Sequence, residues 1–303
     1  MWFNAKEGSG VEGKRRLRAL VEKQDLIVAP GVYDMLSLKV ADSIGFEALY
    51  MTGYGVAASH LGLPDAGLAT YTDMVDRVRR MAEGTNIPLI ADADTGYGGL
   101  LNVRHTVRGY EDAGAQGIQI EDQEMPKKCG HTPGRRIVST EEMVLKIKVA
   151  LEARRREDTL IIARTDARTS LGLDEALRRA EAYAAAGADI IFVESPESEA
   201  ELQKIGASID KPLLANMAQT GRTPVMSAET LKSWGYSIAI YPGLGFLAAA
   251  EAIRDSLLHL KSEGSSIGLQ APLYPSGGDD RTIHQLMGFP DVWEFERRWA
   301  VNA

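Results

Sequence analysis

The chain has little cysteine, no excess of positive charge and no long hydrophobic run. A single cysteine among 303 residues excludes disulfides within the chain and zinc modules built on several cysteines. Lys and Arg number 34 against 42 Asp and Glu, and the net charge of -8 gives no general attraction for nucleic-acid phosphates or anionic lipid. The apolar stretch 246–260 is interrupted by charges well before the roughly 20 residues that span a membrane. We therefore expect neither nucleic acid nor a membrane as a partner.

The N-terminal twenty residues lack the apolar core of a secretory signal peptide. Together with the single cysteine, this predicts a cytoplasmic protein in a reducing compartment, and only the basic run 14–18 favours an organelle. With 45% hydrophobic and 25% charged residues, the composition is that of a globular chain large enough for a sizeable core.

Short β-branched segments alternate with longer amphipathic segments along the chain. The predicted strands are 26–31, 47–53, 88–94, 117–123, 160–166, 190–196, 212–217 and 237–243. Helical patterns lie between them, for example at 71–84, 103–114, 139–155 and 173–187. Eight such units over about 240 residues predict a (β/α)₈ TIM barrel, with 1–303 as a single domain. The alternative, an open doubly wound sheet, would normally begin with a glycine fingerprint that PGVYD after the first strand lacks.

Two segments are additional to the eight β/α units of a minimal barrel. Residues 122–139 join the fourth strand to its helix, where connections usually take about 2–6 residues, so we expect a functional lid. A Gly/Pro/Ser-rich linker at 264–280 leads to a terminal helical pattern at 282–299, which does not follow a predicted strand. Residues 244–253 are apolar around most of a helix. These features predict a C-terminal helical extension from about residue 264 and a homotetramer, with the eighth helix swapped between subunits.

Polar side chains end several predicted strands, where barrel active sites are built. They are Asp65, Asp92, Asp94, Glu121, Asp122, Arg164, Asp166, Glu194 and Asn216. Asp92 and Asp94 are two residues apart, which would place both on one face of a strand. Any one acid alone would serve to cap the next helix. Several acids at one mouth repel each other unless a cation neutralises them, and hard oxygen ligands favour Mg²⁺ or Mn²⁺.

Cys129 lies in KKCGH (127–131), inside the long loop and beside Lys127, Lys128 and His131. Nearby cations make a thiol more acidic, and a loop position makes it accessible. We therefore expect Cys129 to act as an acid, a base or a nucleophile rather than as a core residue.

The segments ADADTGYG (91–98), IQIEDQ (118–123) and KKCGH resemble the isocitrate lyase/phosphoenolpyruvate mutase superfamily. The similarity extends from about Ile27 to Leu260. KKCGH is the most specific of these motifs, because the cysteine loop marks the carbon–carbon lyases of this superfamily, whereas its phosphonate mutases and hydrolases lack the cysteine. The resemblance therefore implies a carbon–carbon lyase and disfavours a substrate with a P–C bond.

The resemblance also implies roles for individual residues. Asp92 would bind Mg²⁺ directly, and Asp65, Asp94 and Glu121 would hold its water shell. Tyr50, Thr52 and the Gly53 backbone would bind the α-keto acid half of a dicarboxylate substrate, and Arg164, Glu194 and Asn216 would bind the other carboxylate. Cys129 would protonate the leaving enediolate, and Asp92, Lys128, Gly130, His131 and Pro242 are further expected substrate contacts. Tyr50, Glu121 and a metal-bound hydroxide are open alternatives for the general base.

The length of the chain and two of its residues reduce the number of expected substrates. It is too short for a true isocitrate lyase and is similar in size to members acting on methylisocitrate, 2,3-dimethylmalate or oxaloacetate. Tyr54 stands where methylisocitrate lyases tend to have glycine, and Pro242 stands where oxaloacetate acetylhydrolases carry a serine. The resemblance therefore implies retro-aldol cleavage of a 2-alkylmalate such as 2,3-dimethylmalate to pyruvate and propionate. The alternatives are an oxaloacetate acetylhydrolase, a methylisocitrate lyase and a catalytically silent binding barrel.

Overall fold

The computed structural model describes residues 16–130, 132, 134–269 and 283–300. Its centre is a closed barrel of eight parallel strands in sequence order, in which β8 pairs with β1. The strands are β1 (Ile27–Val32), β2 (Leu49–Met51), β3 (Leu89–Asp92), β4 (Gly117–Glu121), β5 (Leu160–Thr165), β6 (Ile190–Val193), β7 (Leu213–Asn216) and β8 (Tyr236–Tyr241). The closed barrel confirms the (β/α)₈ prediction and excludes the open sheet.

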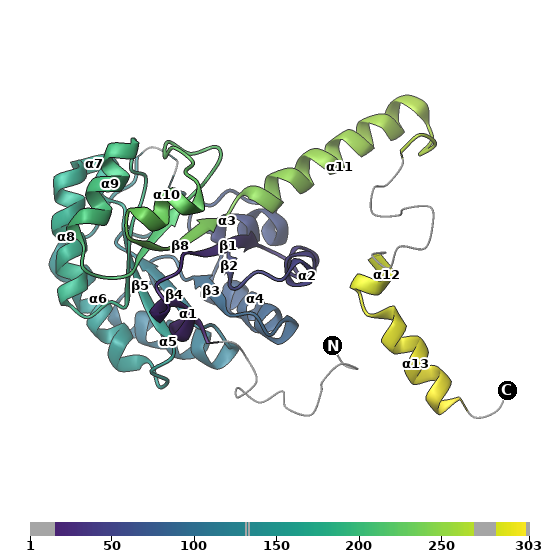
Figure 1. The fold of residues 1–303 in the computed structure, drawn as a ribbon, viewed down its shortest axis with the longest axis horizontal. Coiled ribbons are helices and arrows are strands. Elements are labelled where there is room, and N and C mark those ends of the chain that lie inside the picture. Colours follow the sequence, from purple (N-terminus) through teal and green to yellow (C-terminus); the bar gives the residue numbers. More distant parts are fainter. Residues whose placement is uncertain (1–15, 131, 133, 270–282, 301–303) are drawn as a thin grey trace.

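The described part of the chain contains helices, most of which form the layer outside the strands (Figure 1). They are α1 (Leu17–Glu22), α2 (Met35–Ile44), α3 (Gly53–Val56), the π-helix η2 (Ala57–Leu61), α4 (Tyr71–Gly84), α5 (Leu100–Ala113), α6 (Thr140–Ala153), α7 (Ala167–Leu171), α8 (Leu173–Ala185), α9 (Glu199–Ser208), α10 (Ala228–Ser233), α11 (Leu244–Glu263), α12 (Ile283–Leu286) and α13 (Phe289–Trp299). The amphipathic segments predicted at 71–84, 103–114, 139–155 and 173–187 correspond to α4, α5, α6 and α8, so their bounds were predicted to within a turn.

Apolar side chains fill two layers, because successive residues of a barrel strand point alternately inward and outward. The barrel interior contains Ile27, Ile90, Ile162 and Phe192. The larger layer lies between strands and helices and contains, for example, Leu49 and Ile118. Both faces of each strand are therefore buried, which explains the nearly continuous apolar runs in the sequence.

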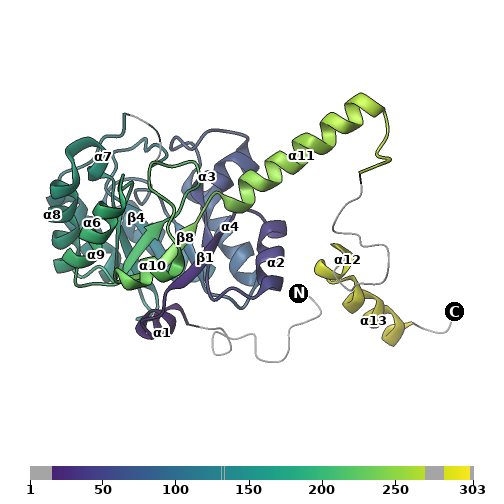
Figure 2. The same cartoon turned by 45° about the horizontal axis from the view of Figure 1, so that its top comes forward.

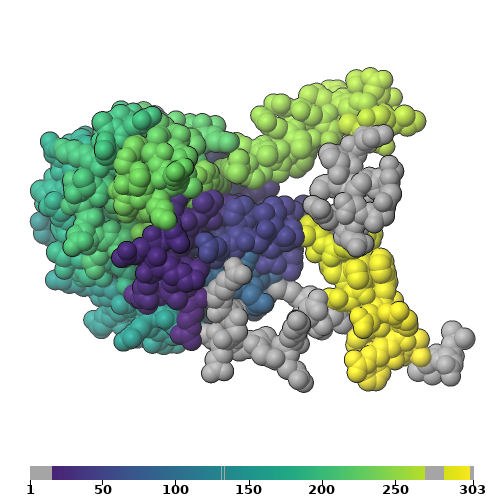
Figure 3. Space-filling model, viewed as in Figure 1, coloured from purple at the N-terminus to yellow at the C-terminus, as the bar shows by residue number. Residues whose placement is uncertain are grey.

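The helix after β8 leaves the barrel. Figures 1 and 2 show α11 projecting from the strand ends, and Figure 3 shows it standing out from the body of the molecule. No residue of α11 is buried, and the side chains of Ile253, Leu257 and Leu258 are more than half exposed. The structure describes one chain, so exchange of this helix between subunits stays a prediction.

The terminal pattern at 282–299 forms two helices, α12 and α13, instead of the expected one. Gly288 has φ of 84°, a left-handed conformation that interrupts the α-helix, and Pro290 follows in the first turn of α13. Thr282 and linker residues 270–280 lie outside the described residues. In the part of the chain that is described, no helix is long and apolar enough to cross a membrane.

Candidate active site

The carboxyl ends of the strands surround a cavity of about 200 Å³. Its wall contains most of the residues expected at the site, namely Tyr50, Thr52, Asp65, Asp92, Cys129, Gly130, Arg164, Glu194, Asn216 and Pro242. It also contains Lys127, which was expected only as a cation beside Cys129. Apolar side chains form another part of the wall, namely Tyr54, Phe192, Ile240, Phe246 and Leu247. The cavity therefore combines charged and apolar surfaces.

Asp92, the last residue of β3, is held from two sides. Its Oδ1 accepts hydrogen bonds from the backbone N–H of Asp94 at 3.0 Å and from Nε2 of Gln119 at 3.3 Å. Gln119 in turn accepts a hydrogen bond from the Tyr50 hydroxyl at 3.0 Å. A Cβ on Gly53 would lie 2.6 Å from Oδ2 of Asp92, so only glycine allows the backbone this close to the carboxylate. Gly53 thus lies beside the acid although it does not line the cavity.

Asp94 does not share a strand face with Asp92. The strand ends at Asp92, and Asp94 adopts a left-handed conformation with φ of 48°, so the prediction from strand alternation was wrong. Its carboxylate is brought to the site by an ion pair instead: Nζ of Lys127 lies 2.7 Å from Oδ1 of Asp94 and 2.5 Å from Oδ1 of Asp65.

Asp65, Asp94 and Lys127 are close enough for each charge to act strongly on the others. Burial raises the pKa of Asp94 to about 7, although the Lys127 ammonium acts in the opposite direction. Desolvation lowers the pKa of Lys127, but Asp94, Asp65 and Asp92 together raise it well above its ordinary value. Lys127 is therefore a buried ammonium ion that offsets part of the negative charge at the mouth.

The acids also provide a test of whether the site suits a divalent cation. Among the described residues, no three His, Cys, Asp or Glu side chains form a ready group of direct ligands. Glu121 is fully buried, and neither of its carboxylate oxygens accepts a hydrogen bond from the described residues, although Arg164 approaches Oε2 at 3.3 Å. Buried acceptors of this kind suit the water molecules that Mg²⁺ retains. The residues fit a cation held directly by one carboxylate and through water by others.

Arg164 projects from β5 into a ring of carboxylates. Its Nε and Nη2 donate to the two oxygens of Asp166 at 3.0 Å each. Its Nη2 also lies 3.6 Å from Oε2 of Glu194, and the guanidinium lies 5.2 Å from the centre of the Phe192 ring. Burial opposes the charge, but these carboxylates raise the pKa of Arg164 well above its ordinary value. The site therefore contains a permanent cation suited to a substrate carboxylate.

Glu194 is fixed by its neighbours after β6 and β7. Nδ2 of Asn216 donates to Oε2 of Glu194 at 3.2 Å, and the Ser195 hydroxyl lies 2.9 Å from Oε1. The same hydroxyl lies 3.1 Å from the carbonyl oxygen of Gly130. Ser195, which the sequence did not indicate, therefore connects the loop to this side of the cavity.

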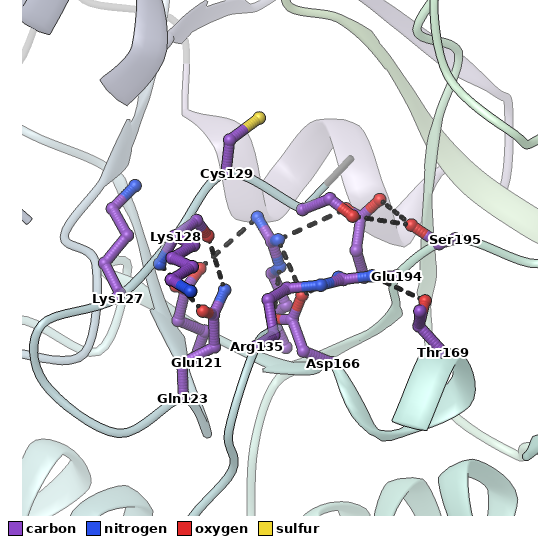
Figure 4. Close-up of polar contacts among 12 residues, drawn as sticks. Glu121, Gln123, Lys127, Lys128, Cys129, Arg135, Asp166, Thr169, Glu194 and Ser195 are labelled. Carbon is purple, nitrogen blue, oxygen red and sulfur yellow. Dashed lines mark hydrogen bonds and ion pairs between the residues drawn. The ribbon is translucent and has the colours of Figure 1, made fainter. Parts of the chain in front are cut away.

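The long loop lies over the cavity, and Figure 4 shows how its side chains diverge. Cys129 lines the cavity, and its backbone N–H donates to the carbonyl of Asp65 at 3.0 Å. Lys128 is exposed, and its ammonium donates to the carbonyl of Gly134 at 3.2 Å. Lys128, an expected substrate contact, therefore does not line the cavity, because its side chain turns outward, whereas Lys127 points inward. His131 lies outside the described residues.

The apolar wall is formed largely by residues near β2 and β8. The rings of Tyr54 and Phe246 pack with their centres 5.4 Å apart. Pro242 follows β8, and a Cβ on Gly31 would lie 2.4 Å from its carbonyl oxygen, so β1 and this turn are in close backbone contact. Sequence reasoning found Tyr54 and Pro242 but missed Phe246, although PGLGF, directly after the eighth strand, placed it within reach of the mouth.

The chain is similar to known proteins in both sequence and structure. The family model described as phosphoenolpyruvate phosphomutase matches residues 17–261. The chain is 48% identical to 2,3-dimethylmalate lyase of Eubacterium barkeri, over 95% of this chain and 98% of that protein. It is 42% identical to 2-methylisocitrate lyase of Aeropyrum pernix, over 94% of this chain and 89% of that one.

Solved structures agree in fold and in family. Oxaloacetate acetylhydrolase bound to 3,3-difluorooxalacetate superposes with a TM-score of 0.88 and 37% identity, covering 96% of this chain and 98% of that one. A 2,3-dimethylmalate lyase gives a TM-score of 0.86 and 38% identity, covering 93% of each chain. Phosphonopyruvate hydrolase with oxalate and Mg²⁺ gives 0.82 and 30%, covering 93% and 97%. The chain is therefore a lyase of the phosphoenolpyruvate mutase/isocitrate lyase superfamily.

Proposed function

We propose that this chain cleaves the C2–C3 bond of a 2-alkylmalate such as 2,3-dimethylmalate, releasing pyruvate and a short carboxylate such as propionate. The observation that carries this proposal is the cavity itself, whose wall contains the charged residues Asp92, Lys127 and Arg164 together with Tyr54 and Pro242. A 2-alkylmalate carries two carboxylates and a hydroxyl for the charged residues and alkyl groups for the other two. The similarity to the E. barkeri 2,3-dimethylmalate lyase supports the same substrate class.

The proposed reaction assigns each group a part. Arg164 and Asn216 bind one carboxylate, while Tyr50 and Thr52 face the hydroxy acid half. The 2-hydroxyl loses its proton to a base, for which Tyr50 and Glu121 are the candidates on this chain. The oxygen electrons form the carbonyl of pyruvate as the C2–C3 bond breaks, and the bonding pair moves onto C3 and its carboxylate as an enediolate. Cys129 then donates a proton to C3.

We infer further that the site binds Mg²⁺, or Mn²⁺ in its place. Asp92 would bind the cation directly, and Asp65, Asp94 and Glu121 would hold it through water. When bound, the cation supplies positive charge beside the hydroxy acid. The relative phosphonopyruvate hydrolase contains Mg²⁺ with oxalate, which supports this inference. Dialysis against EDTA should abolish turnover and added Mg²⁺ should restore it, whereas full turnover in excess EDTA would overturn the inference.

The substrate is tested by a panel of 2,3-dimethylmalate, other 2-alkylmalates, methylisocitrate and oxaloacetate with Mg²⁺. We expect the highest kcat/KM for release of pyruvate from 2,3-dimethylmalate. Oxaloacetate hydrolysis is the second candidate, because the acetylhydrolase structure superposes with a TM-score of 0.88. A higher kcat/KM for conversion of oxaloacetate to oxalate and acetate would replace the lyase proposal with a hydrolase.

A further inference from the structure

Arg135 is a buried arginine of the 122–139 loop that the proposed reaction does not use. Only 3% of its side chain is exposed. Its Nη1 forms an ion pair with Oδ1 of Asp166, and its Nη2 donates to the hydroxyl of Thr169 in α7 (Figure 4). Burying an arginine costs free energy unless its charge is paired and its donors are bonded. The partners of Arg135 therefore indicate what this side chain does.

Asp166 is shared between two arginines. Arg164 donates two hydrogen bonds to this carboxylate, and Arg135 pairs with the same Oδ1 that Nη2 of Arg164 contacts. Asp166 is held in place by its backbone N–H, which donates to Asp122 at 2.8 Å. A carboxylate after β5 thus connects the loop arginine to the arginine that faces the substrate.

The sharing affects the charge available to a ligand. Arg164 contacts three carboxylates, those of Glu121, Asp166 and Glu194, which offset its positive charge. Arg135 provides a second cation for Asp166. Because Arg135 also compensates the charge of Asp166, more of the positive potential of Arg164 is left for a substrate carboxylate.

The loop also touches Arg164 directly. A Cβ on Gly130 would lie 2.5 Å from Nη2 of Arg164 and 3.0 Å from Cδ of Glu194, so the backbone next to Cys129 packs against this cluster. Arg135 lies five residues further along the same loop. A shift of Arg135 would therefore displace Arg164 and the backbone that carries Cys129.

We propose that Arg135 is a positioning residue that, through Asp166, orients Arg164 toward the substrate carboxylate and holds Cys129 against the cavity. The first part rests on the proposed function, since it requires Arg164 to bind a substrate carboxylate. The second part does not, because it concerns only where the loop lies.

The loop is tested by alkylation of Cys129 with iodoacetamide, which reports on one site because the chain has one cysteine. Arg135→Met should be alkylated roughly tenfold faster than the unmodified protein, because local opening of the loop becomes easier. The matched control is Arg136→Met, since that side chain is 73% exposed and pairs with Glu124 at 2.8 Å. It should react at the unmodified rate. An unchanged rate in folded Arg135→Met would overturn the loop-holding part.

The electrostatic part is tested by steady-state kinetics with the best substrate of the panel. Arg135→Met should raise KM by roughly tenfold or more, and Arg135→Lys should recover part of this loss because it keeps the charge beside Asp166. Equal KM values for the Lys and Met variants would overturn this part. Turnover of no panel substrate by the unmodified protein would instead count against the proposed function, and the alkylation result would still stand.

A milder variant covers the case in which Arg135→Met does not fold. Thr169→Val removes one partner of Arg135 and keeps both the volume of the side chain and the ion pair with Asp166. It should give a smaller increase in the alkylation rate, with circular dichroism confirming the fold. Unchanged alkylation in folded Thr169→Val would overturn the loop-holding part as well.

Discussion

Lys127 and Asp94 form a buried ion pair in which Nζ lies 2.7 Å from Oδ1. Both side chains are about 4% exposed, and the pair connects the 122–139 loop to the segment after β3. The adjacent Lys128 is exposed and forms no such buried ion pair. Its ammonium donates to the carbonyl of Gly134 outside the cavity. Two neighbouring lysines of one motif therefore have different surroundings.

Replacing Lys127 with Met should lower the free energy of unfolding by about 3–5 kcal/mol, because Asp94 and Asp65 would lose their buried cation. Turnover should fall as well, since the loop would lose its anchor on these acids. Lys128→Met is the matched control and should change the free energy of unfolding by no more than about 0.5 kcal/mol. Urea unfolding followed by circular dichroism measures both. Similar losses in the two variants would contradict the different burial of the two lysines.

Replacing Cys129 with Ser should leave the fold and substrate binding intact and reduce kcat by at least roughly 10²-fold, the loss typical of a positioned general acid. A serine hydroxyl is too weak an acid to replace the thiol. The measurement is the rate of pyruvate release, with thermal unfolding as the check on the fold. Near-normal turnover would show that Cys129 is not the general acid and is only a structural residue of the loop.

Replacing Pro242 with Ser should raise the kcat/KM for oxaloacetate hydrolysis relative to that for 2,3-dimethylmalate cleavage. Hydrated oxaloacetate carries a second C2 hydroxyl where dimethylmalate has a methyl group, and the proline ring in the cavity wall offers that hydroxyl no hydrogen bond. Pro242→Ala separates removal of the ring from addition of a hydroxyl. If the Ala and Ser variants show the same ratio of the two activities, the hydroxyl has no part in substrate choice.

The exposed helix α11 predicts that the chain is a homo-oligomer, most simply a tetramer. Ile253 is 60% exposed, Leu257 and Leu258 are each 58% exposed, and Trp293 in α13 is 54% exposed. Apolar surface of this extent favours burial against another subunit. Light scattering at micromolar concentration should give a tetrameric mass, and the double variant Leu257→Glu, Leu258→Glu should reduce it. A monomeric mass for the unmodified chain would refute the prediction.

Much of the barrel could be predicted from the chain because its signals are local. Segments 88–94 and 160–166 begin with short apolar runs, and helix 71–84 has regular amphipathic spacing, so these elements follow from local sequence patterns. The break at Gly288 was missed, although GFP (288–290) places glycine directly before a helix with proline in its first turn.

The sequence by itself determined the number and order of the β/α units, several of the acids at the mouth and the loop that carries Cys129. Only the tertiary structure decided which lysine is buried, how Asp94 reaches the site and that Arg135 shares Asp166 with Arg164. The physical reason is that periodicity fixes side-chain directions on strands and helices, whereas in irregular segments the individual backbone dihedrals and long-range packing fix them. The left-handed Asp94 and the outward turn of Lys128 both lie in such segments.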